Sequence, residues 1–136
     1  MTAEEMRVFY DRYVRAANDR EFDFIASLIH DDIILNGKPA KREGAIKAFE
    51  EFAAAVPDIT WKLEDIVVEG DRIAARLRDS GTPRAAFGVE PNGARVEFAE
   101  VAFYKIRDGR FAEMWFMIDV HSIAEQMKGS EAALLR

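Results

Sequence analysis

Apolar residues in the first part of the chain recur with the period of an α-helix. Thr2 followed by Glu5 forms a capping-box pattern, and the apolar positions that follow repeat every three or four residues: Met6, Phe9, Tyr10, Tyr13, Val14 and Ala17. The same period predicts a second, short helix that ends near His30. It returns from Ala45 to Val56, where Pro57 ends it. Between these helices, Ile33–Leu35 is predicted to be a short strand, closed by turn residues at Asn36-Gly37 and Pro39.

After Pro57 the apolar period changes to two, which is typical of strands. Ile59, Trp61 and Leu63 alternate with polar residues, and a slip in parity before Ile66 and Val68 predicts a β-bulge. Glu69-Gly70-Asp71 predicts a turn into a returning strand with Ile73, Ala75 and Leu77. The segment from Gly81 to Gly93 is rich in glycine and proline and predicts an irregular crossing or a long hairpin loop.

The last part of the chain predicts a long hairpin and a helix. Arg95–Ile106 and Phe111–Ile118 are the strands, and Asp108-Gly109 is a strong hairpin-turn signal. Asp119 with Ser122 predicts the start of the last helix, and Gly129 its end. The order of elements indicates one α+β domain over residues 1–136, with three to four helices on one face of a curved antiparallel sheet.

Composition narrows the chemistry that this domain can perform. The 136 residues include 19 Lys and Arg against 25 Asp and Glu, a net charge of −6, which argues against a nucleic-acid partner. The absence of cysteine excludes thiol nucleophiles and thiolate metal sites, and two distant histidines make a metal site unexpected. No segment resembles a signal peptide or a membrane span, so we expect a cytoplasmic protein.

Both strands of the long hairpin are apolar on both faces. In Val96–Ile106 the even positions carry Phe98, Ala102 and Tyr104, while the odd positions carry Val101 and Phe103. Such strands are covered on both sides. Because the helices cover only one face, we expect a homodimer packed through the sheet. The alternative is that the C-terminal segment 130–136 folds over the other face.

Glu100 is the most unusual residue of the sequence. It lies on the even face between Phe98 and Ala102, in a strand too apolar to be an edge. A carboxyl group there is paired, or its pKa is raised by desolvation so that it can act as a general base or acid. The alternative is a Glu at a bulge, turned outward or paired with Arg76 or Arg78.

Other polar residues have simpler interpretations. Asp119 is expected to cap the last helix, and His30 to cap the second helix at the surface. His121 is expected to be exposed. Asn36 closes a strand that could border a cavity, and Trp61, Tyr104, Trp115 and Phe116 could line an apolar pocket or belong to the core.

Several segments of the chain resemble the SnoaL-like polyketide cyclases. They are Pro57-Asp58-Ile59, Glu69–Arg76, Gly81-Thr82, Arg95–Phe98, Phe103–Arg110, Glu113-Met114-Trp115 and Asp119. The resemblance extends from about Tyr10 to Met127. It implies the fold of the nuclear-transport-factor-2-like superfamily: a cone-shaped curved antiparallel sheet with helices on its concave face, an apolar pocket and commonly a dimer.

The resemblance also implies a cofactor-free ring closure that uses a His–Asp pair. The family's histidine corresponds here to Ala102 and its aspartate to Phe116, so both members are replaced by apolar residues. A three-residue turn at Arg107-Asp108-Gly109 would place Glu100 opposite Phe116, and a two-residue turn would place it opposite Met117. We favour the first, because it puts both dyad positions on one face.

Two functions follow from these residues. The first is an enzyme that binds a small apolar carbonyl compound of polyketide or terpenoid type and uses Glu100 as general base in a cyclisation, isomerisation or dehydration. The pocket would be formed by Asn36, Trp61, Ala102, Tyr104, Met114 and Phe116, with Tyr104 or Asn36 donating a hydrogen bond to the enolate oxygen. The second is a non-catalytic module for binding a small molecule or for dimerisation, which has lost the dyad at Ala102 and Phe116.

Overall fold

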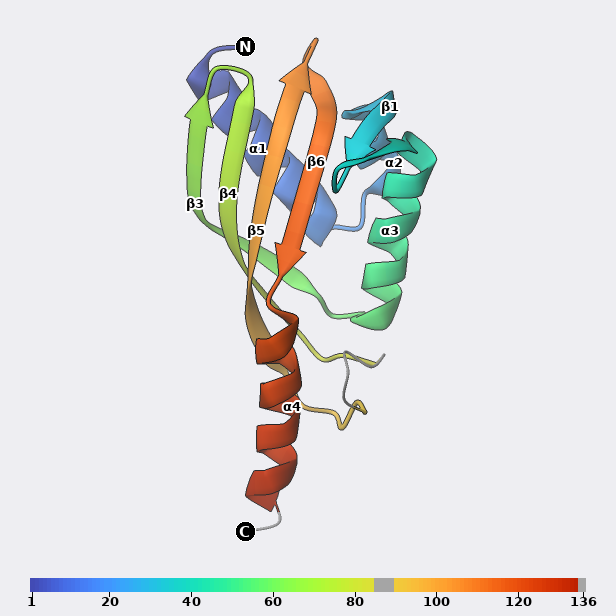
Figure 1. Cartoon of the computed structure of the whole chain (residues 1–136), viewed down its shortest axis with the longest axis vertical. Coiled ribbons are helices and arrows are strands. Elements are labelled where there is room, and N and C mark those ends of the chain that lie inside the picture. Colours follow the sequence, from blue (N-terminus) through green and yellow to red (C-terminus); the bar gives the residue numbers. More distant parts are fainter. Residues whose placement is uncertain (85–89, 135–136) are drawn as a thin grey trace.

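The computed structural model of the protein describes residues 1–84 and 90–134, which form four helices and six strands (Figure 1). In chain order the elements are α1 (Ala3–Asn18), α2 (Phe22–Ser27), β1 (Ile29–Leu35), β2 (Lys38–Lys41), α3 (Arg42–Ala55), β3 (Thr60–Glu69), β4 (Arg72–Gly81), β5 (Val96–Arg107), β6 (Arg110–Ile118) and α4 (Val120–Leu134).

All six strands form one curved sheet in the order β2-β1-β6-β5-β4-β3. The meander from β3 to β6 is antiparallel, as is the β1–β2 hairpin. β1 runs parallel to β6, a pairing that the predicted antiparallel sheet did not contain. A hairpin cannot join parallel neighbours, and most of the chain separates these two strands. The α+β class is confirmed: α1 crosses one face of the meander, and α3 stands beside β1 and β2 (Figure 1).

The first helix forms as the sequence predicts. The backbone N–H of Thr2 donates to Glu5 Oε1 at 2.8 Å, and the N–H of Glu5 donates to Thr2 Oγ1 at 3.1 Å, which closes the capping box. The helix buries its apolar side against the concave face of the sheet through Met6, Tyr10, Tyr13, Val14, Ala16 and Ala17. This buried side later supplies one wall of the cavity.

The second helix ends earlier than predicted, and His30 does not cap it. The helix stops at Ser27, and β1 begins at Ile29 because Ile29 already pairs with Phe111 of β6. His30 is therefore a buried strand residue, and its Nε2 lies 2.6 Å from the carbonyl oxygen of Arg107. Because a carbonyl only accepts, His30 Nε2 donates this hydrogen bond.

Two further expectations concern the later part of the chain. Asp119 caps α4 as predicted, since its Oδ1 accepts from the N–H of Ser122 at 3.0 Å. The prediction that Gly129 ends this helix is wrong, because α4 continues to Leu134 through strong helix formers that follow the glycine. The predicted irregular segment between Gly81 and Gly93 lies partly outside the described residues.

The β5–β6 hairpin has a turn of two residues and a bulge beside it. Asp108 and Gly109 have φ values of +51° and +74°, which suit a tight hairpin turn. The three-residue turn that we favoured is therefore wrong. A register shift between Lys105 and Ile106 places Glu100 opposite Ile118, so both predicted partners, Phe116 and Met117, are wrong as well. The bulge adds one residue to β6, which moves the partner of Glu100 from Met117 to Ile118. Because Ile118 and Phe116 lie on the same face of β6, Glu100 still shares a face with Phe116.

The close approach of Gly81 to the chain after α3 generates a stability prediction. A Cβ at Gly81 would lie 2.5 Å from Cγ1 of Val56, whereas nothing lies within 4 Å of a Cβ at Gly44 in α3. We expect Gly81→Ala to destabilise the fold by about 1–3 kcal/mol through overpacking. We expect Gly44→Ala, the matched control, to be neutral or stabilising by up to about 1 kcal/mol. Urea unfolding measures both; equal effects would contradict the packing at Gly81.

Candidate functional site

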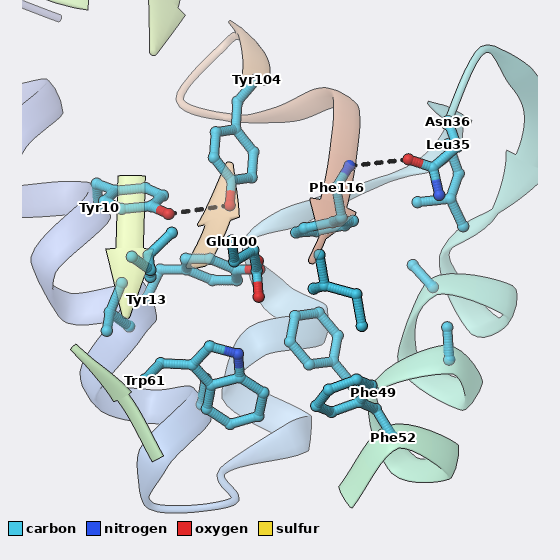
Figure 2. Close-up of a pocket in the computed structure, with 16 residues that line it drawn as sticks. Tyr10, Tyr13, Leu35, Asn36, Phe49, Phe52, Trp61, Glu100, Tyr104 and Phe116 are labelled. Atoms are coloured by element: carbon cyan, nitrogen blue, oxygen red, sulfur yellow. Dashed lines mark hydrogen bonds between the residues drawn. The ribbon is translucent and has the colours of Figure 1, made fainter. Parts of the chain in front are cut away.

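A cavity of about 260 Å³ opens between α1, α3 and the concave face of the sheet (Figure 2). Its walls come from both helices, from the end of β1 and from β3 to β6. Sixteen residues line it: Tyr10, Tyr13, Val14, Ala17, Leu35, Asn36, Ala45, Ala48, Phe49, Phe52, Trp61, Leu77, Glu100, Tyr104, Phe116 and Ile118. Among these lining residues Glu100 is the one carboxylic acid, and Lys, Arg and His are absent.

The walls of the cavity are largely aromatic. Phe49 of α3 packs edge-on against Tyr13, Trp61 and Phe116, with ring centroids 6.0, 6.3 and 6.1 Å apart. Tyr104 packs edge-on against Phe116 at 5.9 Å. Such edge-to-face contacts stabilise the arrangement beyond the area that each ring buries. The rings therefore form a rigid apolar enclosure around the few polar groups.

Glu100 points into this enclosure from β5 (Figure 2). The residue is 7% exposed, and burial raises the pKa of its carboxyl group above the ordinary value. A hydrogen bond from the Trp61 indole favours the charged form and offsets part of this increase. The alternative pairing with Arg76 or Arg78 is wrong, because both arginines lie on the other face and contact Glu64 at 3.3 and 3.6 Å.

Asp79 of β4 is a second buried carboxyl group, and the sequence prediction missed it. Its exposed fraction is 0%, and no N–H or O–H donor of the described residues reaches either carboxyl oxygen. Burial, and then the neighbouring Glu100, raise its pKa to about 10. A signal was present in the sequence: Ile73, Ala75 and Leu77 face inward at every second position, and Asp79 is the next such position.

The three tyrosines of the chain gather beside Glu100. The hydroxyl groups of Tyr10 and Tyr104 lie 3.0 Å apart and form a hydrogen bond between α1 and β5 (Figure 2). Burial raises the pKa of Tyr10, Tyr13 and Tyr104 well above the ordinary phenol value. All three therefore remain protonated at neutral pH. One hydroxyl of the Tyr10–Tyr104 pair donates to the other, and the hydroxyl that accepts keeps its own proton for a further hydrogen bond.

Asn36 lies at the edge of the cavity in a fixed orientation. Its backbone is left-handed, with φ of +49°, and its N–H donates to the carbonyl oxygen of Met114 at 2.9 Å. The side-chain Oδ1 accepts from the N–H of Phe116 at 2.8 Å (Figure 2). Because a backbone N–H only donates, the amide oxygen of Asn36 must face Phe116. The amide NH₂ group can therefore donate to a ligand.

The structure brings together some of the expected pocket residues and not others. Asn36, Trp61, Tyr104 and Phe116 line the cavity together with Glu100. Ala102 and Met114 share their face of the sheet but do not line the cavity. Both are 0% exposed, and the larger rings of Tyr104 and Phe116 on the same face reach the cavity instead. Trp115 points to the opposite face and is 44% exposed.

The sequence prediction also missed most of the helical wall. Tyr10, Tyr13 and Val14 of α1 and Phe49 and Phe52 of α3 all line the cavity. Their helical spacing marks them as inward-facing, but spacing alone does not separate cavity residues from core residues. Within the residues that the structure describes, no cluster of three His, Asp or Glu side chains suits a metal ion. No helix in this part of the chain has the length and apolar character needed to cross a bilayer.

The raised pKa of Asp79 predicts how stability changes with pH. Between the ordinary value of 3.8 and about 10, the folded state holds a proton on Asp79 that the unfolded state releases. Stability from this group is therefore present at low pH and is lost as pH rises, by at most about 1.4 kcal/mol per pH unit. We expect Asp79→Asn to make this decline shallower, and so to stabilise the protein increasingly as pH rises from 5 to 9.

Asp58→Asn serves as the control for this prediction because its sign is opposite. The N–H of Thr82 donates to Asp58 at 2.7 Å and lowers the pKa of this exposed carboxyl group. Its stabilising effect is present above the ordinary Asp pKa and is lost on acidification. Asp58→Asn should therefore lower stability at neutral pH. Denaturant unfolding across pH measures both variants; an unchanged slope in Asp79→Asn would contradict a protonated Asp79.

Comparisons with known proteins agree with this architecture. The sequence profile described as SnoaL-like polyketide cyclase matches residues 7–127. A crystal structure of a SnoaL-like polyketide cyclase from Agrobacterium tumefaciens strain C58 is 30% identical, with a TM-score of 0.80 over 87% of this chain and 94% of that chain. IdmH from Streptomyces antibioticus, a candidate polyketide cyclase, is 27% identical, with a TM-score of 0.81 over 90% of this chain and 97% of that chain.

A third protein with a similar structure has been assigned a different activity. AclR from Streptomyces galilaeus, a candidate hydroxylase, is 24% identical, with a TM-score of 0.81 over 93% of this chain and 87% of that chain. At that identity the likeness concerns the fold alone. No match was found among curated proteins. Since the family profile spans most of the sequence, this chain belongs to the SnoaL-like polyketide cyclase family.

Proposed function

We propose that this protein is a cofactor-free enzyme that removes a proton next to the carbonyl group of a small, uncharged and mostly apolar compound. The observation that carries the proposal is the single carboxylic acid, Glu100, in a cavity that is otherwise lined by apolar, phenol and amide side chains. A buried carboxyl group of this kind is suited to general acid–base chemistry, because desolvation brings its pKa closer to neutral pH. Polyketide- and terpenoid-like carbonyl compounds fit these requirements.

The charge of the lining residues restricts the substrate. A carboxylate or phosphate in the cavity would meet Glu100 without a cation among the lining residues to balance it. The aromatic walls of Phe49, Trp61 and Phe116 favour a flat, apolar body. We therefore propose an uncharged substrate, with its carbonyl oxygen on the polar side of the cavity.

The chemistry follows from the positions of the polar groups. The Glu100 carboxylate takes the proton from the carbon next to the carbonyl, and the C–H electron pair moves to the carbonyl oxygen as an enolate. Tyr104 or the amide NH₂ of Asn36 donates a hydrogen bond to that oxygen. In a cyclisation, the enolate carbon then attacks a second carbonyl of the same molecule, and Glu100 returns the proton to the new alkoxide.

Ala102 and Phe116 favour a second candidate function, a non-catalytic module that binds a small molecule. These positions correspond to the family's His–Asp pair, and in this protein they lie opposite each other on β5 and β6 as apolar residues. A non-catalytic module that binds a small molecule would have the same cavity without needing a base. The two functions differ in one respect: the enzyme requires ionised Glu100, and the binding module does not.

Removal of the base tests the proposal. We expect Glu100→Gln to slow exchange of the α-hydrogens of 2-tetralone with D₂O by about 100-fold or more, because general-base catalysis contributes about 10²–10⁴-fold. The melting temperature should stay unchanged or increase, because a buried charge is removed. Proton NMR follows the exchange, and Glu97→Gln on the exposed face of the same strand is the control. Full activity in Glu100→Gln would remove Glu100 from the mechanism. No exchange by the wild type above buffer would contradict the enzyme and favour the binding module.

We also propose that the outer face of the sheet binds a second copy of the chain. Four large apolar side chains form two cross-strand pairs there, Val101 with Met117 and Phe103 with Trp115, and their exposed fractions are 38, 71, 58 and 44%. Beside them, charges of both signs alternate in a network of Glu64, Arg76, Arg78, Glu97 and Arg95. An apolar centre with a mixed-charge border is self-complementary under a two-fold axis, which supports a homodimer.

Charge placed in the apolar centre tests the dimer. We expect the double variant Phe103→Glu, Met117→Glu to sediment as a monomer, because like carboxylates would face each other across the two-fold axis. Val8→Glu is the control, since Val8 is similarly exposed, at 52%, on α1. Sedimentation velocity of the three proteins decides the question. A wild-type monomer, or a double variant that still forms dimers, would contradict this interface.

A further inference from the structure

Asp79 and Glu100 lie next to each other on the concave face of the sheet. In the register of β4 and β5, Asp79 pairs with Phe98, and Leu77 pairs with Glu100. Asp79 and Glu100 are therefore diagonal neighbours on one face, a separation that side chains of this length bridge. Glu100 lines the cavity, whereas Asp79 lies behind it and is completely buried. We refer to these two groups as the carboxyl pair.

The donors around the carboxyl pair are distributed unequally. The Trp61 indole and Asp79 lie beside Glu100, and both favour the charged form of its carboxyl group. Asp79 receives no hydrogen bond from the described N–H and O–H donors, and both its burial and its neighbour favour its neutral form. Two carboxylates side by side in such an environment cannot both be ionised. The remaining donor is a carboxyl proton, and the distribution assigns that proton to Asp79.

We infer that Asp79 keeps its proton and donates it in a hydrogen bond to the Glu100 carboxylate, so that Asp79 is the positioning residue for the catalytic base. This inference rests on the proposed function, since it assigns Asp79 a role through Glu100. Asp79 does not line the cavity and does not touch the substrate. It fixes the direction of the Glu100 carboxylate together with Trp61, which leaves one carboxylate oxygen directed to the cavity.

The other groups that face the carboxyl pair do not compete for this proton. Tyr10 and Tyr13 of α1 and Tyr104 of β5 are phenols that remain protonated. The residues that line the cavity from β3, β6 and α3 have no titratable group. With the proton on Asp79, the negative charge of the carboxyl pair lies on Glu100, the group that borders the cavity.

Infrared spectroscopy of the full chain in D₂O near neutral pH locates the proton. We expect the wild type to show the C=O stretch of one protonated carboxyl group. The band should disappear in Asp79→Asn, where an amide NH₂ still donates to ionised Glu100, and should persist in Glu100→Gln. Both replacements conserve size. Absence of the band from the wild type, or its persistence in Asp79→Asn with loss in Glu100→Gln, would overturn the inference.

The pH profile of the exchange reaction tests positioning. With 2-tetralone as the probe, we expect Asp79→Asn to keep the acidic limb of the wild-type profile, because the hydrogen bond to Glu100 is conserved. Asp79→Leu cannot donate, so its acidic limb should move upward by about one pH unit or more. A limb that is unchanged in Asp79→Leu would overturn the positioning role. If none of the proteins catalyses exchange, the proposed function is contradicted. The infrared band still reports whether Asp79 is protonated, because it requires no turnover.

Discussion

A carboxylate that is removed from water is stable only where hydrogen-bond donors replace the water. In this protein two carboxyl groups, Asp79 and Glu100, lie against the inner face of one sheet, and few donors reach them. The Trp61 indole stabilises the charged form of Glu100, whereas no N–H or O–H donor of the described residues reaches Asp79. We infer that this imbalance determines which group holds the proton and which holds the charge. The chemistry that we propose for the cavity depends on that division.

The fold makes this arrangement possible through the parity of its strands. β4 and β5 present Asp79 and Glu100 on the concave face, while Arg76 and Arg78 on the opposite face contact Glu64 instead. The same alternation on β5 and β6 places Phe103 and Trp115 outside, where we propose a second copy binds. α1 and α3 then enclose the inner face with aromatic side chains. One alternating pattern therefore supplies both the cavity and the outer apolar surface.

Local signals in the sequence were sufficient for most of the elements. The capping box at Thr2 and the cap at Asp119 act over a few residues and form as predicted. The hairpin at Asp108-Gly109 also forms, but with two residues in its turn rather than the three that we favoured. Long-range pairing was less predictable: β1 lies parallel to β6, and a bulge in β6 sets the partner of Glu100. No local pattern encodes either feature. Asp79 was missed for another reason, because an aspartate in an apolar series looks like the end of the inward face rather than its continuation.

Membership of the SnoaL-like polyketide cyclase family agrees with the cavity. The positions at which the resemblance to this family implies a His–Asp pair are Ala102 and Phe116 here. Our account replaces that pair with Glu100 held by Asp79. The most direct measurement is a carbon-13 NMR titration of the side-chain carboxyl groups in the wild-type protein. The account predicts one glutamate that ionises at higher pH than an ordinary glutamate, and one aspartate that stays protonated up to a pH of about 10. A titration in which every aspartate and glutamate ionises near its ordinary pKa would contradict it.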